Sequence, residues 1–160
     1  MIQIERVATG IAGLDPLIEG GFPKGRSILV TGEPGTGKTQ LAASIAHELD
    51  FPPPLEFHTK TTSMAKDLFY RYDTLAHFHD AQFRKEGVPV EAYITYEALG
   101  LAILLAMEPK EAEPHLQPEL RGKGPMRSVV LVDEIDKAPR DLPNDVLNEV
   151  EHLCFTVKET

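Results

Sequence analysis

The sequence has little cysteine, no long apolar run and few basic residues, and each shortage excludes a class of protein. Cys154 is the single cysteine in the chain, so no disulfide can form within it, and we expect a reducing, cytoplasmic setting. No apolar run is long enough to span a bilayer and no signal-peptide pattern is present, so no membrane role is expected. The formal net charge of −9 argues against broad electrostatic binding of nucleic acid.

The length and composition are typical of one globular domain. A chain of 160 residues is long enough to bury a real hydrophobic core. The 13 prolines fall in clusters and mark loops. We expect a single domain over residues 1–160, divided into a lead-in segment over 1–25, a first half over 26–107, a mobile loop over 109–127 and a second half over 128–160.

One glycine-rich stretch at residues 26–39, RSILVTGEPGTGKT, organises the rest of the sequence. An apolar strand over 28–30 leads into a turn that fits G-x-x-x-x-G-K-[ST], and a helix begins at its end. Glycines let the backbone approach phosphate oxygens without a Cβ in the way, and N–H groups at the helix start bind those oxygens. The stretch therefore predicts a nucleotide-phosphate site, made by Glu33, Pro34, Gly35, Thr36, Gly37, Lys38, Thr39 and Gln40.

Two side chains of this turn have specific roles in phosphoryl chemistry. Lys38 reaches the β- and γ-phosphates and stabilises the charge of the transferred group, which makes it a catalytic candidate. The Thr39 hydroxyl is a ligand for Mg²⁺. The cofactors we expect are therefore a nucleoside triphosphate and Mg²⁺.

A second motif follows in the run SVVLVDEIDKAP. Residues 129–132 form an uninterrupted apolar strand, typical of a parallel strand covered on both faces. Asp133 and Glu134 stand at its carboxyl end, where open α/β sheets place their ligands. We assign Asp133 to Mg²⁺, through its water shell, and Glu134 to the activation of the attacking water.

The other elements are predicted from hydrophobic periodicity and turn residues. The fold class expected is a P-loop NTPase: a three-layer α/β/α domain with a mainly parallel sheet. Residues 1–25 are expected to cap the nucleotide edge of that sheet. We predict strands at Ile2–Ile4, 55–59 and 154–157. We also predict a helical turn at 14–18, a helix that follows Thr39 and continues to Leu49, and helices over 63–85, 90–107 and 144–153.

Two families resemble different parts of the chain. TGIAGLDPLIEGGFPKGRSILVTGEPGTGKT resembles the opening of the KaiC/RadA branch of RecA-like ATPases, over about residues 1–39. HTKTTSMAKDLFYRYDTLAHFHDAQ and RSVVLVDEIDKAPRDLPNDVLNEVEHL resemble a MoxR-type AAA+ ATPase, over about 32–157. The second resemblance implies a Walker A motif at Gly32–Thr39, a Walker B motif ending in Asp133 and Glu134, and ATP rather than GTP. It also implies a homo-oligomer, usually a hexameric ring, that remodels or activates a partner, often a protein with a von Willebrand A domain.

The two resemblances differ over catalysis. KaiC-type enzymes tend to carry catalytic glutamates at the end of the second strand, but here that strand ends in His58, Thr59 and Lys60, with no carboxylate after Glu56. The AAA+ resemblance further implies a sensor strand between the phosphate-loop and Walker B strands, an arginine finger and a helical lid. The sequence stops at Thr160 without them, so we expect an incomplete sheet in a fragment of a longer protein.

Two alternatives stay open beside an Mg²⁺-dependent ATPase. The chain is a nucleotide-binding fragment, holding ATP or ADP with little or no hydrolysis, or it is a RecA/KaiC-like module acting in recombination or signalling. His77 and His79 are a poor metal-chelating pair, because residues two apart on a helix point to different sides.

Overall fold

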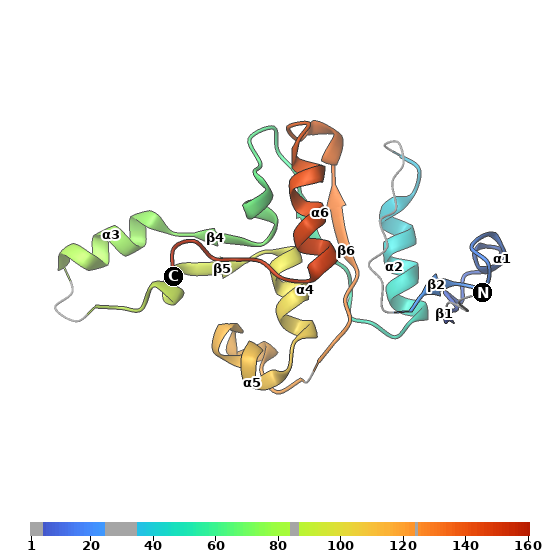
Figure 1. Ribbon diagram of the computed structural model, residues 1–160, viewed down its shortest axis with the longest axis horizontal. Coiled ribbons are helices and arrows are strands. Elements are labelled where there is room, and N and C mark those ends of the chain that lie inside the picture. The colour runs from blue at the N-terminus through green and yellow to red at the C-terminus, as the bar shows by residue number, and fades with distance from the viewer. Residues whose placement is uncertain (1–4, 25–34, 84–86, 124) are drawn as a thin grey trace.

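A computed structural model describes residues 5–24, 35–83, 87–123 and 125–160 (Figure 1). Within these ranges the strands form three two-stranded sheets. The predicted strand at 28–30 and the predicted strand at Ile2–Ile4 lie outside the described residues. The pairs are β1 (Arg6–Val7) with β2 (Phe22–Pro23), antiparallel; β3 (Leu55–His58) with β6 (Val130–Asp133), parallel; and β4 (Tyr70–Tyr72) with β5 (Ile94–Tyr96), antiparallel.

The parallel pair β3 and β6 forms the centre of the molecule. The two strands run in register from Leu55 opposite Val130 to His58 opposite Asp133. Helix α4 (Ala98–Ala106) packs against both strands, and its sequence ALGLAILLA is apolar on every side because the helix is largely buried. The parallel sheet and the α/β content that the sequence predicts are therefore present.

Helix α4 also approaches the chain segment before β4 unusually closely. A Cβ added to Gly100 would lie 2.0 Å from the backbone oxygen of Phe69, so only glycine fits there. Phe69 belongs to the larger hydrophobic core, which α6 (Leu142–His152) completes from the C-terminal half. The fully or nearly buried members of this core are Leu68, Phe69, Tyr70, Ile103, Leu142 and Val146.

Helix α2 (Lys38–Glu48) confirms the helix predicted after the glycine-rich turn. It buries Ala42, Ile45 and Ala46 and lies against β6. In Figure 1, α2 begins on the same side of the molecule as the end of β6, and it runs in the opposite direction to that strand. The start of the helix and the carboxyl end of the strand therefore face one edge.

The N-terminal unit is held together by two polar residues. Asp15, in the short helix α1 (Leu14–Leu17), accepts hydrogen bonds from the backbone N–H of Thr9 at 2.7 Å and from its hydroxyl at 2.6 Å. These bonds stabilise the ionised carboxylate and lower the pKa of Asp15. Arg6 donates to the carbonyl oxygens of Ile18 and Gly21, both at 2.9 Å, which ties β1 to the turn before β2.

The position of this unit corrects one expectation. A Cβ at Gly10 would lie 2.8 Å from Oε2 of Glu48, the last residue of α2. The unit therefore contacts the end of α2 opposite to the phosphate loop (Figure 1). The prediction that the lead-in caps the nucleotide edge is wrong for the described part of this segment.

The helix predicted over 63–85 is wrong in its first half. Ala65–Leu68 is a short 3-10 helix, β4 follows, and only Thr74–Phe83 is an α-helix, α3. Leu68, Phe69 and Tyr70 are consecutive and all buried, which no single helix face allows. Figure 1 shows α3 extending away from the body, and no residue of this helix, which is described throughout, is buried.

The helix predicted over 90–107 begins later than expected. Val90–Tyr93 is a 3-10 helix, β5 follows at Ile94–Tyr96, and α4 supplies the rest. Isoleucine, threonine and tyrosine favour an extended chain, and pairing with β4 overrides the helical spacing that we used for the prediction.

Two further segments differ from their predictions. Residues 109–127, expected as a mobile loop, contain α5 (Pro109–Ala112) and two 3-10 helices, Glu113–His115 and Pro118–Leu120. Ala112 and Leu116 are buried against Leu104 and Leu105, so apolar packing orders this charged and proline-rich stretch. Residues 154–157 form no strand; the ring of Phe155 instead stacks on Phe69, with centroids 5.3 Å apart. Among the helices described, none combines the length and apolar character needed to cross a bilayer.

Candidate functional site

The phosphate loop is described from Gly35 onward, and Gly32, Glu33 and Pro34 lie outside the described residues. Gly35 and Gly37 both have φ of 80°, in the left-handed region where glycine carries no steric cost. Gly37 is the N-cap of α2, and within the described loop no side chain caps the helix. The partial positive charge of the helix N-terminus therefore favours an anion at this turn.

The side chains that follow the loop lie at the start of α2. Lys38 is the first residue of the helix and is half-buried, whereas Thr39 and Gln40 are exposed. The partial positive charge of the helix N-terminus and the Lys38 ammonium thus lie together, as binding of a polyphosphate requires.

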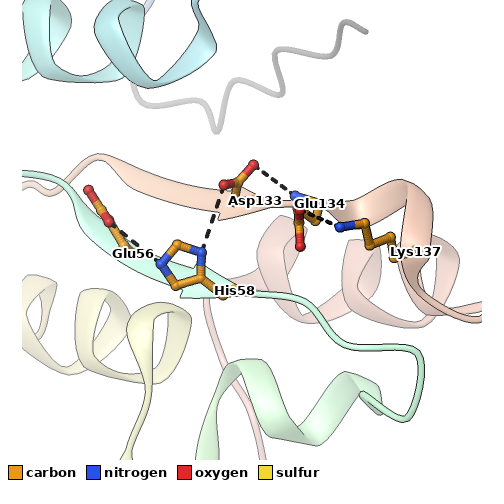
Figure 2. Close-up of polar contacts among 5 residues, drawn as sticks. All are labelled: Glu56, His58, Asp133, Glu134 and Lys137. Atoms are coloured by element: carbon orange, nitrogen blue, oxygen red, sulfur yellow. Dashed lines mark hydrogen bonds and ion pairs between the residues drawn. The ribbon is translucent and has the colours of Figure 1, made fainter. Parts of the chain in front are cut away.

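The carboxylates lie at the end of β6 (Figure 2). Asp133 is the last residue of the strand, and its Oδ1 accepts a hydrogen bond of 2.9 Å from the backbone N–H of Glu134. Glu134 has φ of 56°, a left-handed conformation that is uncommon for a residue with a side chain. This conformation ends the strand sharply and turns the chain into a 3-10 helix over Ile135–Lys137.

Lys137 holds the Glu134 carboxylate from one helical turn away. Its Nζ forms an ion pair with Oε1 of Glu134, and both side chains are about half exposed. The hydrogen bond to Glu134, together with nearby Asp136 and Asp133, raises the pKa of Lys137. In this structure the Glu134 carboxylate, which we assign to water activation, is therefore paired with the Lys137 ammonium.

His58 lies across the strand pair from Asp133. Its Nδ1 is 3.8 Å from Oδ2 of Asp133, and its Nε2 is 3.9 Å from Oε2 of Glu56. Figure 2 shows the imidazole between the two carboxylates. The next residue, Thr59, is buried, and its Oγ1 has no hydrogen-bond partner among the residues that the structure describes. Its backbone N–H donates to the Asp133 carbonyl at 3.1 Å.

The oxygen atoms at this edge fit a magnesium ion bound to a nucleotide. In the part of the chain that the structure describes, no cluster of three or more His, Cys, Asp or Glu residues would hold a metal on its own. Mg²⁺ does not need one, because it takes few protein ligands and fills its remaining positions with water and phosphate oxygens. A hydroxyl at Thr39 and a carboxylate at Asp133 are of the right chemical type.

Sequence reasoning identified both ends of the site and missed the groups between them. Glu56 and His58 share one face of β3, as side-chain alternation places residues two apart, but their register with Asp133 depends on the strand pairing. The spacing of Glu134 and Lys137 suits an ion pair on a helical turn, and this signal was available from the sequence.

Two family models match overlapping parts of the chain. A family model described as "ATPase family associated with various cellular activities (AAA)" matches residues 28–153, which include both motifs. A second family model, the ATPase KaiC, matches residues 7–48, which include the N-terminal unit, the phosphate loop and α2.

Several curated relatives are similar to this chain over short stretches. A UPF0273 protein of Methanopyrus kandleri is 56% identical over 38 residues, which cover 24% of this chain and 15% of that protein. The circadian clock oscillator protein KaiC of Prochlorococcus marinus is 44% identical over 46 residues, covering 29% of this chain and 9% of the relative. The circadian clock protein KaiC2 of a Synechocystis strain is 58% identical over 46 residues, covering 28% and 8%.

The chain thus spans only 8–15% of the length of these curated relatives. No solved structure matches the chain.

Proposed function

Because the chain belongs to the ATPase family associated with various cellular activities (AAA), we propose that it binds ATP with Mg²⁺ and hydrolyses the β–γ phosphoanhydride. One observation carries this proposal: α2 begins, and β6 ends, at the same edge of the molecule, and the two elements are in contact (Figure 1). That edge combines a cationic, glycine-lined helix start with two adjacent carboxylates, Asp133 and Glu134.

The phosphates bind at the helix start. Backbone N–H groups of the loop and of the first turn of α2 donate to the phosphate oxygens, and Lys38 neutralises the β- and γ-phosphate charge. The loop residues Glu33, Pro34, Gly35, Thr36 and Gly37 complete this binding surface, followed by Thr39 and Gln40 at the start of the helix.

Thr39 and Asp133 would hold the magnesium ion. The ion supplies electrostatic stabilisation of the phosphate charge when it is bound with the nucleotide. Oδ1 of Asp133 accepts the backbone N–H of Glu134, so Oδ2 would be the oxygen left to hold the ion through its water shell.

Glu134 orients the attacking water and accepts its proton. Its carboxylate is exposed enough to meet water, with 46% of the side chain accessible. To do so it leaves Lys137, and an exposed ion pair of this kind costs little to separate because solvent screens it.

We further propose that hydrolysis drives the remodelling of a partner protein. Residues 58–82 and 127–153 resemble MoxR-type AAA+ proteins, which supports assembly into a homo-oligomeric, hexameric ring that remodels a protein, for example one with a von Willebrand A domain. The exposed helix α3, with Leu75, Phe78 and Phe83 each more than 60% accessible, suits contact with another protein.

A second function, nucleotide binding with little turnover, is favoured by one specific observation. The Glu134 carboxylate is already paired with Lys137, and the KaiC-like match ends at residue 48, before either carboxylate. A protein of this kind retains ADP through purification without releasing phosphate.

Two variants test the proposed roles of Lys38 and Glu134, and phosphate release by the unaltered chain separates the two functions. Lys38→Ala should lose binding of a fluorescent ATP analogue, and Glu134→Gln should keep binding and lose phosphate release. Lys110→Ala and Glu151→Gln, exposed charges on α5 and α6, are matched controls and should behave as the unaltered chain. Hydrolysis by Glu134→Gln at the unaltered rate would refute the assignment of Glu134, and tight binding by Lys38→Ala would refute the phosphate site. Binding without hydrolysis in the unaltered chain would establish the second function.

A further inference from the structure

His58 is the residue of β3 that faces the metal-binding end of β6. The parallel register places its Cα opposite that of Asp133, so the two side chains leave neighbouring strands at the same level. The imidazole is 67% accessible and the Asp133 side chain 43%, so both are open to a ligand from solvent. His58 is therefore placed to act on Asp133 without being part of the hydrophobic core.

The two oxygens of Asp133 have different surroundings. Oδ1 accepts the backbone N–H of Glu134, which leaves Oδ2 as the oxygen that faces the imidazole, 3.8 Å from Nδ1. The second ring nitrogen of His58 is 3.9 Å from Oε2 of Glu56, two residues earlier on the same strand. Glu56 thus restrains the ring, and the ring in turn restrains Oδ2 of Asp133 (Figure 2).

We propose that His58 is a positioning residue that fixes the Asp133 carboxylate in the orientation in which it receives Mg²⁺–ATP. This inference rests on the proposed function. Carboxylates at metal sites are usually held by an outer partner, and loss of that partner typically weakens metal affinity by about 10- to 100-fold. Both distances here exceed a direct hydrogen bond, so an N–H of the imidazole acts electrostatically or through one bridging water.

Contacts between exposed charges usually contribute little to protein stability, so removal of His58 should change the stability of the fold very little. A surface pair of histidine and carboxylate changes the free energy of unfolding very little, because solvent screens both groups. If His58 orients Asp133, the effect of its removal appears in metal dependence and hardly at all in stability. That difference separates positioning from a structural role.

The experiment is a titration of Mg²⁺ against binding of a fluorescent ATP analogue, followed by fluorescence anisotropy. For His58→Ala we expect the Mg²⁺ concentration at half-maximal binding to rise by about 10-fold, while binding without Mg²⁺ and the melting temperature stay unchanged. His58→Gln keeps an N–H donor and should recover part of the loss. Glu56→Gln, which loosens the ring, should shift the titration in the same direction by less.

The matched control is His47→Ala. His47 is also an exposed histidine beside a carboxylate, with Nδ1 3.7 Å from Oε1 of Glu48, but it lies at the far end of α2. Its removal should leave the Mg²⁺ titration unchanged.

The possible failures are distinguishable. If His58→Ala melts normally and keeps the unaltered Mg²⁺ dependence, the inference about His58 is wrong while the proposed function stands. An equal shift in His47→Ala would also overturn it, because a general loss of histidine would then explain the effect. If the unaltered chain binds no nucleotide at any Mg²⁺ concentration, the proposed function fails, and the inference about His58 fails with it. Should His58→Ala not fold, the milder His58→Gln and Glu56→Gln variants decide the question by the same titration.

Discussion

Replacement of Gly100 by alanine should destabilise the whole domain, although alanine is the better helix former. Gly100 lies within α4, and a Cβ there would meet the Phe69 backbone oxygen at 2.0 Å, where ordinary contact begins at 3.4 Å. The obstacle is backbone and cannot rotate away, so α4 and the segment before β4 must separate by about 1.4 Å.

The magnitude follows from what this separation disturbs. The backbone N–H of Glu97 donates to the same Phe69 oxygen at 2.9 Å, and loss of this bond costs about 1 kcal/mol. Overpacking of the buried face around Ile103 costs a further 1–3 kcal/mol, roughly, and helix propensity returns about 1 kcal/mol. We expect a net loss of about 1–3 kcal/mol, which lowers the melting temperature of a chain of this size by roughly 3–10 °C.

Circular dichroism of thermal unfolding measures this change, and Gly87→Ala supplies its control. Nothing lies within 4 Å of a Cβ at Gly87, so that variant should melt within a degree or two of the unaltered chain. A Gly100→Ala variant that melts at or above the unaltered temperature would refute the close approach of α4 to Phe69.

Two further perturbations concern charged groups. Lys137→Ala releases the Glu134 carboxylate and should raise ATP turnover by a few-fold at most, because solvent screens an exposed ion pair. A coupled-enzyme assay that shows slower turnover would contradict this. Asp15→Asn removes a carboxylate whose pKa is lowered in the folded chain by the Thr9 hydrogen bonds. The ionised carboxylate therefore stabilises the fold above its ordinary pKa of 3.8, and this stabilisation disappears as the pH falls through the lower folded pKa. Urea unfolding should show the unaltered chain more stable than Asp15→Asn at neutral pH, with a difference that shrinks below about pH 4. A constant difference across that range would show that Asp15 acts through packing.

The elements that the sequence predicts correctly have a strong local cause. Helix α2 begins directly after glycines that adopt φ of 80°, and its apolar spacing continues to Glu48. Strand β6 is an unbroken apolar run that ends in two acids. Both ends of the candidate site lie on these elements, so their order along the chain suffices to place them at one edge of a parallel sheet.

The segments that were predicted wrongly depend on tertiary contacts. Residues 68–72, LFYRY, are mostly aromatic and fit a helix or a strand. Pairing with β5 and the close packing of Phe69 against α4 decide for the strand. Ala112 and Leu116 are ordered only because α4 offers Leu104 and Leu105 to pack against. No local pattern in a charged, proline-rich stretch signals such a partner. Likewise, His58 meets Asp133 through strand register, which depends on residues more than 70 positions apart in the sequence.

The two family matches differ in how much of the candidate site they cover. The KaiC-like match ends at residue 48, so it covers the phosphate loop and α2 but neither carboxylate. Only the AAA match, which extends to residue 153, includes Asp133 and Glu134. Similarity to KaiC proteins therefore bears on phosphate binding alone, whereas hydrolysis rests on the AAA match and on the contact between α2 and β6. It follows that Lys38→Ala tests phosphate binding, which both matches support, and Glu134→Gln tests hydrolysis, which the AAA match alone supports.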